Sequence, residues 1–435
     1  MDAPPSPAVK RRRSRVPESV TALTRIGEEI ERRWSARKYR HNYFHDIAAE
    51  CLHAAAYHGR FDEDEIIKWV NRASSLPQQL DPRSNFGQPP ITVWRTDRFV
   101  VDLYFWVDTD TSTHDHSFSG AFTNLVGQSL NCTYRFEQGV EVDEGVLLGS
   151  LLLNRAELMN PGHTCAIPSG SKFIHRVWHL DCPTITLVPR TVTRQRGLRQ
   201  YSYYQEGMAV RYRHKAPIEF QRRREFLNYL FRRQHPRRIE LAQEVLGRAR
   251  GYRLFTLLGD LLFHLKDRNE LDDLIGRLPA KGREWFDTAF TVMRATDPLK
   301  GVYWRRLART EHRLLIALLS TFHDSGSTAE WLARHGYAGD WTTMLTSWLA
   351  EMDQDKALRL QLGSARTEIM SHLLRGMSDE QALRELRTTY TITEPEAELL
   401  MQGFKRFREL HFLKPLFHSG LHAEVGSVVA RAASV

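Results

Sequence analysis

The sequence predicts an α+β multidomain protein, with a central antiparallel sandwich or small barrel between an N-terminal helical segment and a large C-terminal all-helical domain. Two observations lead to this prediction. Short β-type runs follow one another from Ile91 to Val188 with no helical pattern between them, which is typical of an antiparallel sandwich or small barrel. On either side, apolar residues recur at helical spacing instead. A chain of 435 residues has room for about three such parts.

The N-terminal part divides into a tail, a helical segment and a linker. Residues 1–16 are predicted to be a disordered basic tail, because a run of basic residues follows a proline-rich start. Residues 17–76 are predicted to be helical, since Ile26, Ile30 and Trp34 recur at helical spacing. The stretch that follows is rich in proline, glutamine and asparagine, and a composition of that kind is typical of a linker.

Residues 88–212 are predicted to form the barrel. The expected strands are 91–95, 99–107, 121–126, 130–137, 146–153, 164–167, 173–180 and 184–188. Eight short strands without intervening helices favour a closed or double-layered antiparallel sheet. The segment from Tyr201 to Tyr212 fits either one more hairpin or a loop that covers the barrel.

Residues 217–435 are predicted to form a helical domain. Its two clearest apolar stripes are Leu254, Leu257, Leu258, Leu261, Leu262 and Leu265, and Leu307, Leu314, Leu315, Leu318, Leu319 and Phe322. Stripes of this width line a protein core, and we expect both to be buried. We find no repeat of fixed period that would indicate a helical solenoid.

The net charge is +9 and the isoelectric point about 9.4, but the excess of basic residues does not predict a nucleic-acid partner. Outside the tail, the basic clusters between Arg222 and Arg238 belong to an amphipathic helical pattern, which indicates a solvated helix face. They come without any known nucleic-acid-binding motif. A protein partner for the helical domain is left open, and a basic surface would suit an acidic one.

The expected location is the cytoplasm. No apolar run reaches the ~18 residues of a transmembrane helix, and the N-terminus shows no apolar stretch of a secretory signal. The four cysteines are scattered without a CxxC pair, which argues against a disulfide framework and fits a reducing compartment.

The informative segment for function runs from Thr111 to Phe122 and contains His114 and His116. In an extended chain residues two apart share a face, so both imidazoles can point to one place. The later strand 173–180 presents His175 and His179 on one face, by the same alternation. His114, His116 and His175 are therefore predicted to hold one metal ion and to leave coordination positions open.

Two stretches resemble the two motifs of the cupin family, and more specifically those of thiol dioxygenases of the cysteine dioxygenase type. They are Ser112–Leu130, with its SxHDHS pattern, and Ile174–Val177, which reads IHRV. Together with the strand order the resemblance covers roughly residues 91–190. It implies a jelly-roll cupin with non-haem Fe(II) on the three histidines. Gly120 and Ala121 stand where the general cupin motif has a glutamate, and this departure favours a site of three histidines alone.

The resemblance also points to residues that would act on a substrate. In the thiol dioxygenases a serine, a histidine and a tyrosine follow the last ligand; here Thr186 alone keeps a hydroxyl. An arginine that binds the substrate carboxylate would be matched by Arg95, with an ordinary surface-strand arginine as the alternative. His179 is on the same face as His175, so it is a candidate to support the metal ligands from behind or to act as a general base. The alternative is an ordinary histidine packed in the barrel.

These residues favour an oxygenase that combines O2 with a small thiol- or carboxylate-bearing substrate at Fe(II). A second hypothesis is a cupin small-molecule-binding or sensing module, not an enzyme, whose helical domain recruits a partner. A third is a zinc or manganese cupin with isomerase or hydrolase chemistry, since three histidines and a water suit those metals too. The sequence names neither the substrate nor the reason for the helical domain.

Overall fold

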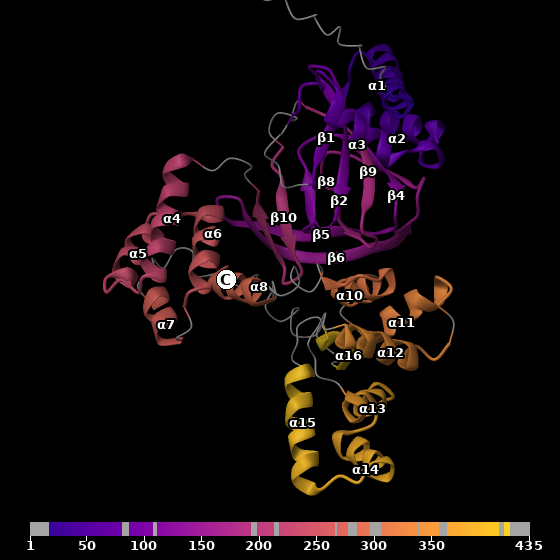
Figure 1. Cartoon of the computed structure of the whole chain (residues 1–435). Coiled ribbons are helices and arrows are strands. Elements are labelled where there is room, and N and C mark those ends of the chain that lie inside the picture. The colour runs from indigo at the N-terminus through magenta and orange to yellow at the C-terminus, as the bar shows by residue number, and fades with distance from the viewer. Residues whose placement is uncertain are drawn as a thin grey trace, which may run out of the picture.

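The computed structural model describes residues 17–80, 87–107, 111–192, 198–212, 217–265, 268–276, 285–295, 306–322, 324–337, 339–355, 363–408 and 413–417. The predicted basic tail, residues 1–16, lies outside the described residues. Figure 1 shows a central β-structure with the N-terminal helices against one side and two groups of C-terminal helices against the other parts of it. The predicted α+β architecture, with a central antiparallel barrel between an N-terminal helical segment and a large C-terminal helical region, is confirmed.

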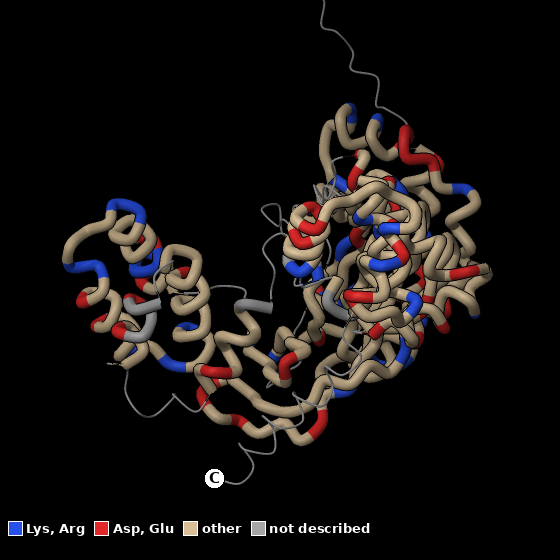
Figure 2. The backbone as a smooth tube through the Cα atoms, turned by 90° about the horizontal axis from the view of Figure 1, so that it is seen from below, with Lys and Arg blue, Asp and Glu red and all other residues tan. Residues whose placement is uncertain are grey.

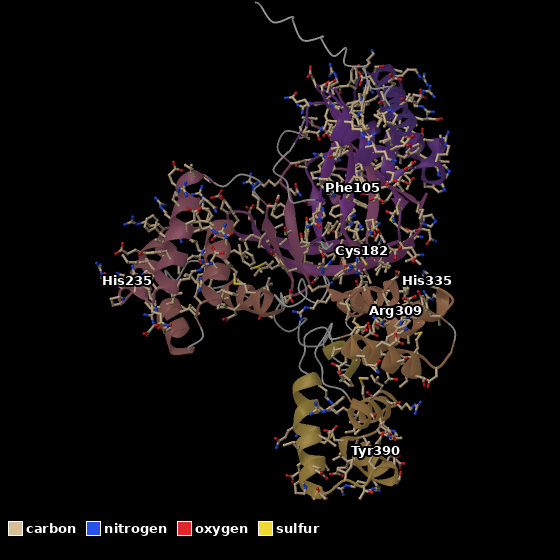
Figure 3. All side chains as sticks on the ribbon, in the orientation of Figure 1. Phe105, Cys182, His235, Arg309, His335 and Tyr390 are labelled. Carbon is tan, nitrogen blue, oxygen red and sulfur yellow. The ribbon has the colours of Figure 1, made fainter. Side chains whose placement is uncertain are left out.

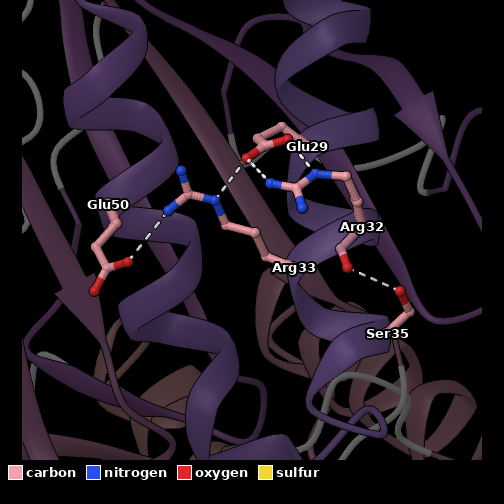
Figure 4. A network of polar contacts seen from close by, with 5 residues as sticks. All are labelled: Glu29, Arg32, Arg33, Ser35 and Glu50. Atoms are coloured by element: carbon pink, nitrogen blue, oxygen red, sulfur yellow. Dashed lines mark hydrogen bonds and ion pairs between the residues drawn. The ribbon is translucent and has the colours of Figure 1, made fainter.

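Three helices form the N-terminal segment: α1 (Glu18–Ala36), α2 (Phe44–Ala55) and α3 (Glu63–Arg72). Helix α3 begins at Asp62, whose side chain accepts a hydrogen bond from the Glu65 backbone N–H at 3.2 Å, as a capping residue should. Arg33 joins α1 to α2, since it bonds Glu29 on its own helix and Glu50 on the other (Figure 4). These contacts are exposed, so packing of the buried faces is what holds the helices.

The strands are β1 (Pro90–Arg95), β2 (Phe99–Trp106), β3 (His114–His116), β4 (Gly120–Val126), β5 (Ser129–Asp143), β6 (Val146–Met159), β7 (Thr164–Ile167), β8 (Gly170–His179), β9 (Thr184–Thr191), β10 (Tyr201–Tyr204) and β11 (Met208–Arg211). One sheet has the order β1-β2-β9-β4-β7. The other, β10-β11-β6-β5-β8-β3, closes on itself through the pair Ser202 and His114. All the pairings are antiparallel.

Two strands are much longer than the apolar alternation predicts. The sequence predicts 130–137 and 146–153, whereas β5 and β6 extend to Asp143 and Met159 and pair along most of their length. The residues added at the end of β5 are exposed or half-buried, and so are those added to β6 apart from Met159, so hydrophobic alternation gives a weak signal there. Backbone pairing continues because β11 pairs with the start of β6, which gives that end of the hairpin a neighbour.

The C-terminal helices are α4 (Ile218–Arg232), α5 (Arg238–Gly247), α6 (Gly251–Leu262), α7 (Arg268–Gly276), α8 (Phe286–Ala295), α10 (Thr310–Phe322), α11 (Ser325–Arg334), α12 (Trp341–Gln354), α13 (Gly363–Leu374), α14 (Asp379–Thr389), α15 (Glu394–Arg408) and α16 (Lys414–Phe417). Both predicted stripes are buried apart from Leu262 and Phe322, which are half-buried. Ser378 and Gln381 form a capping box at the start of α14.

Three groups of helices pack on the barrel. Each packs on strand residues that point away from the barrel interior, because side chains alternate between the two faces of a strand. Phe99, Val101, Leu103 and Phe105 of β2 face away from the barrel interior and form one core with α1 and α2. Ile174 and Trp178 of β8 face outward on another side and share a core with α10 and the helices after it. Helices α4 to α8 pack on Val146 of β6 and Val210 of β11. The barrel is therefore walled by helices, while its interior is left for other side chains.

Helix α10 is tied to the turn that follows β8. The Thr310 hydroxyl donates to the Asp181 carboxylate, and Arg313 donates to the Asp181 backbone carbonyl at 3.3 Å. Figure 3 shows Cys182, the residue after Asp181, at the edge of the barrel that faces Arg309 and helix α10. The helical domain thus reaches the chain two residues after the last inward histidine of β8, His179.

Charged residues of both signs are interspersed over the described backbone (Figure 2). Several basic side chains of α4 and α5 form ion pairs on the surface, among them Arg222 with Glu225 and Arg237 with Glu240. This arrangement is that of the predicted solvated face. In the described part of the chain, no helix is both long enough and apolar enough to cross a bilayer.

We expect Trp34→Ala to lower the free energy of unfolding by about 3–5 kcal/mol, because the indole is 3% exposed and packs on the rings of Phe44 and Phe99. Denaturant unfolding followed by near-ultraviolet circular dichroism measures the loss. Ile67→Ala is the control, since Ile67 is 47% exposed, and it should change stability by less than about 1 kcal/mol. Equal losses in the two variants would contradict the docking of α1 on the sheet.

Candidate metal centre

Two paired strands bring the three predicted ligands together. His114 and His116 lie on β3, and His114 pairs directly with His175 on β8. Because side chains alternate along a strand, His114 and His116 face the barrel interior while Asp115 between them faces the other way. All three histidines are at least nine-tenths buried.

The three imidazoles converge closely enough to hold one ion. One ring nitrogen of each histidine lies within 4.8 Å of the others, and no carboxylate or thiol belongs to the group. The Nε2 atoms of His116 and His175 are 3.0 Å apart. Two nitrogens bound at right angles to one ion, each about 2.1 Å from it, would also be about 3 Å apart. The donor set and its spacing therefore fit a divalent metal ion.

In two of the rings, a neighbouring hydrogen-bond acceptor determines which nitrogen carries the hydrogen and which keeps a lone pair. The Nδ1 atom of His114 lies 2.6 Å from the backbone carbonyl of Ser112, which can only accept a hydrogen bond, so Nδ1 carries the hydrogen. His175 Nδ1 donates in the same way to the Asn131 side-chain oxygen on β5, at 3.2 Å. Each ring is left with a lone pair on Nε2, the atom that faces the other histidines. His116 Nδ1 has no such partner among the described residues.

The electrostatic surroundings keep the rings neutral. Burial lowers the pKa of His114 and, more strongly, those of His116 and His175, whose pKa values the neighbouring rings lower further. A metal ligand has to be deprotonated, and a histidine with a depressed pKa offers its lone pair without losing a proton first. The three residues thus form a preorganised neutral donor set.

Asp115 locks this strand to the rest of the barrel. Its carboxylate accepts a hydrogen bond from the Tyr201 backbone N–H at 2.7 Å and one from the Tyr203 hydroxyl at 2.9 Å. Burial raises the pKa of Asp115 to about 6. The segment from Tyr201 to Tyr212, which the sequence left open, is thereby the β10–β11 hairpin, and its first strand is held against the strand of the ligands.

The histidines open onto a cavity of about 740 Å³ between the two sheets. Its inner wall is made by the inward-facing residues of three strands: Asp102, Tyr104 and Trp106 of β2, Thr186, Val188 and Arg190 of β9, and His175, Val177 and His179 of β8. A volume of this size is in the usual range for a small-molecule site. The mouth includes residues of β10 and of the segment before β1, such as Ser202 and Gln79.

His179 and Thr186, two of the predicted catalytic residues, lie on this wall. The His179 ring stacks on Trp106 with 4.2 Å between centroids, and its Nδ1 is 3.2 Å from the Ser129 hydroxyl. Burial and the nearby charge of Arg313 lower its pKa to about 3, so the ring is neutral at physiological pH. The Thr186 hydroxyl accepts from the Trp106 indole N–H at 2.9 Å. Catalytic roles for both stay predictions.

Arg95, the third predicted catalytic residue, is not among the residues that line this cavity. One of its terminal nitrogens lies 3.4 Å from the backbone carbonyl of Gln78, and Arg95 is half-buried at the end of β1. A different arginine lines the cavity, Arg190 of β9, and it is paired with the buried Asp102. The sequence pattern missed it because the predicted strand ended at Val188; one more step of two residues along the same face reaches Arg190.

Comparisons of the sequence with protein-family models and with curated proteins gave no match. Solved structures are similar over about a third of the chain. A cupin superfamily protein from Desulfitobacterium hafniense DCB-2 shares 14% identity over 28% of this chain and 99% of that one, with a TM-score of 0.18. A DMSP lyase from Ruegeria pomeroyi DSS-3 shares 15% identity over 33% of this chain and 68% of that one, with a TM-score of 0.21.

A sugar phosphate isomerase from a cupin superfamily, from Silicibacter pomeroyi DSS-3, shares 18% identity over 32% of this chain and 84% of that one, with a TM-score of 0.19. With TM-scores this low, none of these similarities supports an assignment of function. The description of the site rests on the strand pairing and on the side chains of this chain.

We expect Asn131→Leu to weaken metal binding by roughly 10–100-fold, because it removes the acceptor that orients the His175 ring. Titration calorimetry with Zn²⁺ or anaerobic Fe²⁺ measures the affinity. Asn71→Leu, at an exposed position of α3, is the matched control and should bind as the unmodified protein does. Unchanged affinity in a folded Asn131→Leu protein would show that this hydrogen bond does not support a ligand.

Proposed function

We propose that this chain is a mononuclear non-haem iron enzyme of the cupin type, a dioxygenase that acts on a small thiol- or carboxylate-bearing metabolite. The observation that carries the proposal is the group of three buried, neutral histidines with no carboxylate among them. The resemblance of SxHDHS and IHRV to thiol dioxygenase motifs supports iron and O2 as the partners.

The donor set decides what such a site could do. His114, His116 and His175 would hold the ion on one side, and the cavity lies on the other. When bound, Fe(II) would supply Lewis-acid and redox chemistry with its full positive charge, since three neutral ligands cancel none of it. Zinc or manganese would fit the same three nitrogens, and metal analysis separates these possibilities.

The chain's own residues would exclude water and orient the substrate. The cavity wall is largely aromatic and aliphatic near the histidines, with Phe118 and Phe122 against the imidazole rings. A dry site of this kind strengthens every polar interaction within it. The neutral ring of His179 and the Thr186 hydroxyl could position a substrate group, although each already has a hydrogen-bond partner in the wall.

A second candidate function is a cupin sensing module whose helical domain recruits a partner. It is favoured by one observation: the core of α10 and the later helices includes the outward face of β8, the strand that carries His175 and His179. A ligand-induced shift of β8 would therefore act directly on the helical domain. This reading predicts tight ligand binding with no consumption of O2.

We expect protein prepared without oxygen and loaded with Fe²⁺ to hold about one iron per chain, and its nitric oxide adduct to show that positions remain open. His116→Ala should hold almost none, whereas His53→Ala, at an exposed position, should hold as much as the unmodified protein. Elemental analysis and electron paramagnetic resonance are the measurements, and oxygen uptake with a panel of thiol- and carboxylate-bearing compounds of different size tests turnover. Iron that is absent, or unaffected by His116→Ala in a folded protein, would contradict the proposal.

A further inference from the structure

We infer that Arg190 binds the carboxylate of the substrate and that the apolar wall beside it holds a body larger than that of a two- or three-carbon metabolite. The substrate class is then an amphipathic monocarboxylate. This inference deepens the proposed function and depends on it in one respect, because the charge balance below counts a divalent ion at the three histidines.

A buried ion pair opens onto the cavity. Asp102 is 2% exposed, and its carboxylate is saturated: Thr92 donates to one oxygen at 2.7 Å, and Tyr104 and Arg190 donate to the other at 3.2 and 3.0 Å. Arg190 reaches Asp102 through Nε and Nη2. A guanidinium has five N–H groups, so this pair orients Arg190 and leaves it capacity to bind a planar anion.

Arg190 lies on the side of the cavity where the histidines are. Its guanidinium is 5.7 Å from the centre of the Phe118 ring, and that ring is 4.4 Å from the ring of His116. A carboxylate on Arg190 would therefore lie on the same side of the cavity as His116, with the Phe118 ring in contact with both residues. Arg95 has no such placement, since it is outside the cavity lining.

The charge balance favours an anion. Apart from the histidines, Asp102 and Arg190 are the charged residues among those that line the cavity in the described part of the chain, and they cancel. With three neutral histidines, the charge of a divalent ion is then left uncompensated in a buried site. Burial of an isolated charge is costly, and an anionic ligand would neutralise part of it.

The remaining wall suits an apolar body. Tyr104, Trp106, Phe122, Ile167, Val177 and Val188 form one buried cluster and also line the cavity. Tyr104 and Val188 adjoin the Asp102–Arg190 pair, whereas Trp106 is at the end of β2 farthest from Arg190, so the apolar wall begins at the ion pair and extends away from it. A cavity of about 740 Å³ is far larger than a two-carbon carboxylate needs, and apolar walls reward a ligand that covers them.

Three probes separate these features: 3-phenylpropanoate, its neutral amide, and acetate. We expect iron-loaded protein to bind 3-phenylpropanoate about tenfold or more tightly than either of the others, measured by calorimetry without oxygen. Arg190→Gln should lose the preference for the acid over the amide. Trp106→Ala, which removes apolar wall at the end of β2 farthest from Arg190, should weaken 3-phenylpropanoate and spare acetate.

Arg190→Gln leaves the Asp102 charge buried without its partner and could unfold the barrel. The double variant Arg190→Gln with Asp102→Asn removes both charges, and it should lose the same preference while remaining folded. Arg95→Gln, which removes the arginine predicted from the sequence, should bind all three probes like the unmodified protein.

Equal binding of the acid and the amide, a preference that survives in the double variant, or the absence of binding to iron-loaded protein would each overturn the inference. Iron content is measured on every sample. If iron-loaded protein does not bind 3-phenylpropanoate, only the role of Arg190 is contradicted. If the protein takes up no iron, the proposed function is contradicted instead.

Discussion

The pairing of His114 on β3 with His175 on β8 is the contact on which the rest of the site depends. It places histidines from two strands side by side, and the period of two along β3 adds His116 to the same face. Asp115 uses the opposite face of the same three-residue strand to hold β10, so the strand is fixed from both sides.

Helices around the barrel explain why its interior can remain hollow. β2 turns Phe99, Val101, Leu103 and Phe105 toward α1 and α2, and β8 turns Ile174 and Trp178 toward the C-terminal helices. Burial of these outward faces supplies packing that a small barrel otherwise obtains by filling its centre. The inward faces are then free to carry histidines, an ion pair and an apolar wall. The helices that contact the barrel, such as α6, α8 and α10, thus have a structural reason.

Alternation in the sequence was sufficient to predict most of the strands and the face on which each histidine lies. These are local properties of an extended chain, in which side chains alternate between the two faces. Alternation could not predict the ion pair of Asp102 and Arg190, because their strands β2 and β9 are about 90 residues apart and their pairing is a tertiary fact. Asn131 escaped for the same reason: its role depends on β5 lying beside β8.

The helical half shows the same limit. Both apolar stripes were predicted to be buried, but a stripe does not say what it packs against. The first stripe shares a core with the start of β6 and with β11. The second stripe shares a core with the outward face of β8, the strand of His175. The match of Arg95 to a carboxylate-binding arginine rested on sequence order alone, and the structure offers Arg190 at the place where such a residue could act.

X-ray absorption at the iron edge of anaerobically loaded protein tests the central claim most directly, because it reports the atoms bound to the metal. We predict a coordination shell with three imidazole nitrogens, completed by light atoms from solvent, which changes when His116 is replaced by alanine. A shell that contains sulfur, or one that shows fewer than two imidazoles and is the same in His116→Ala, would contradict the assignment of this centre.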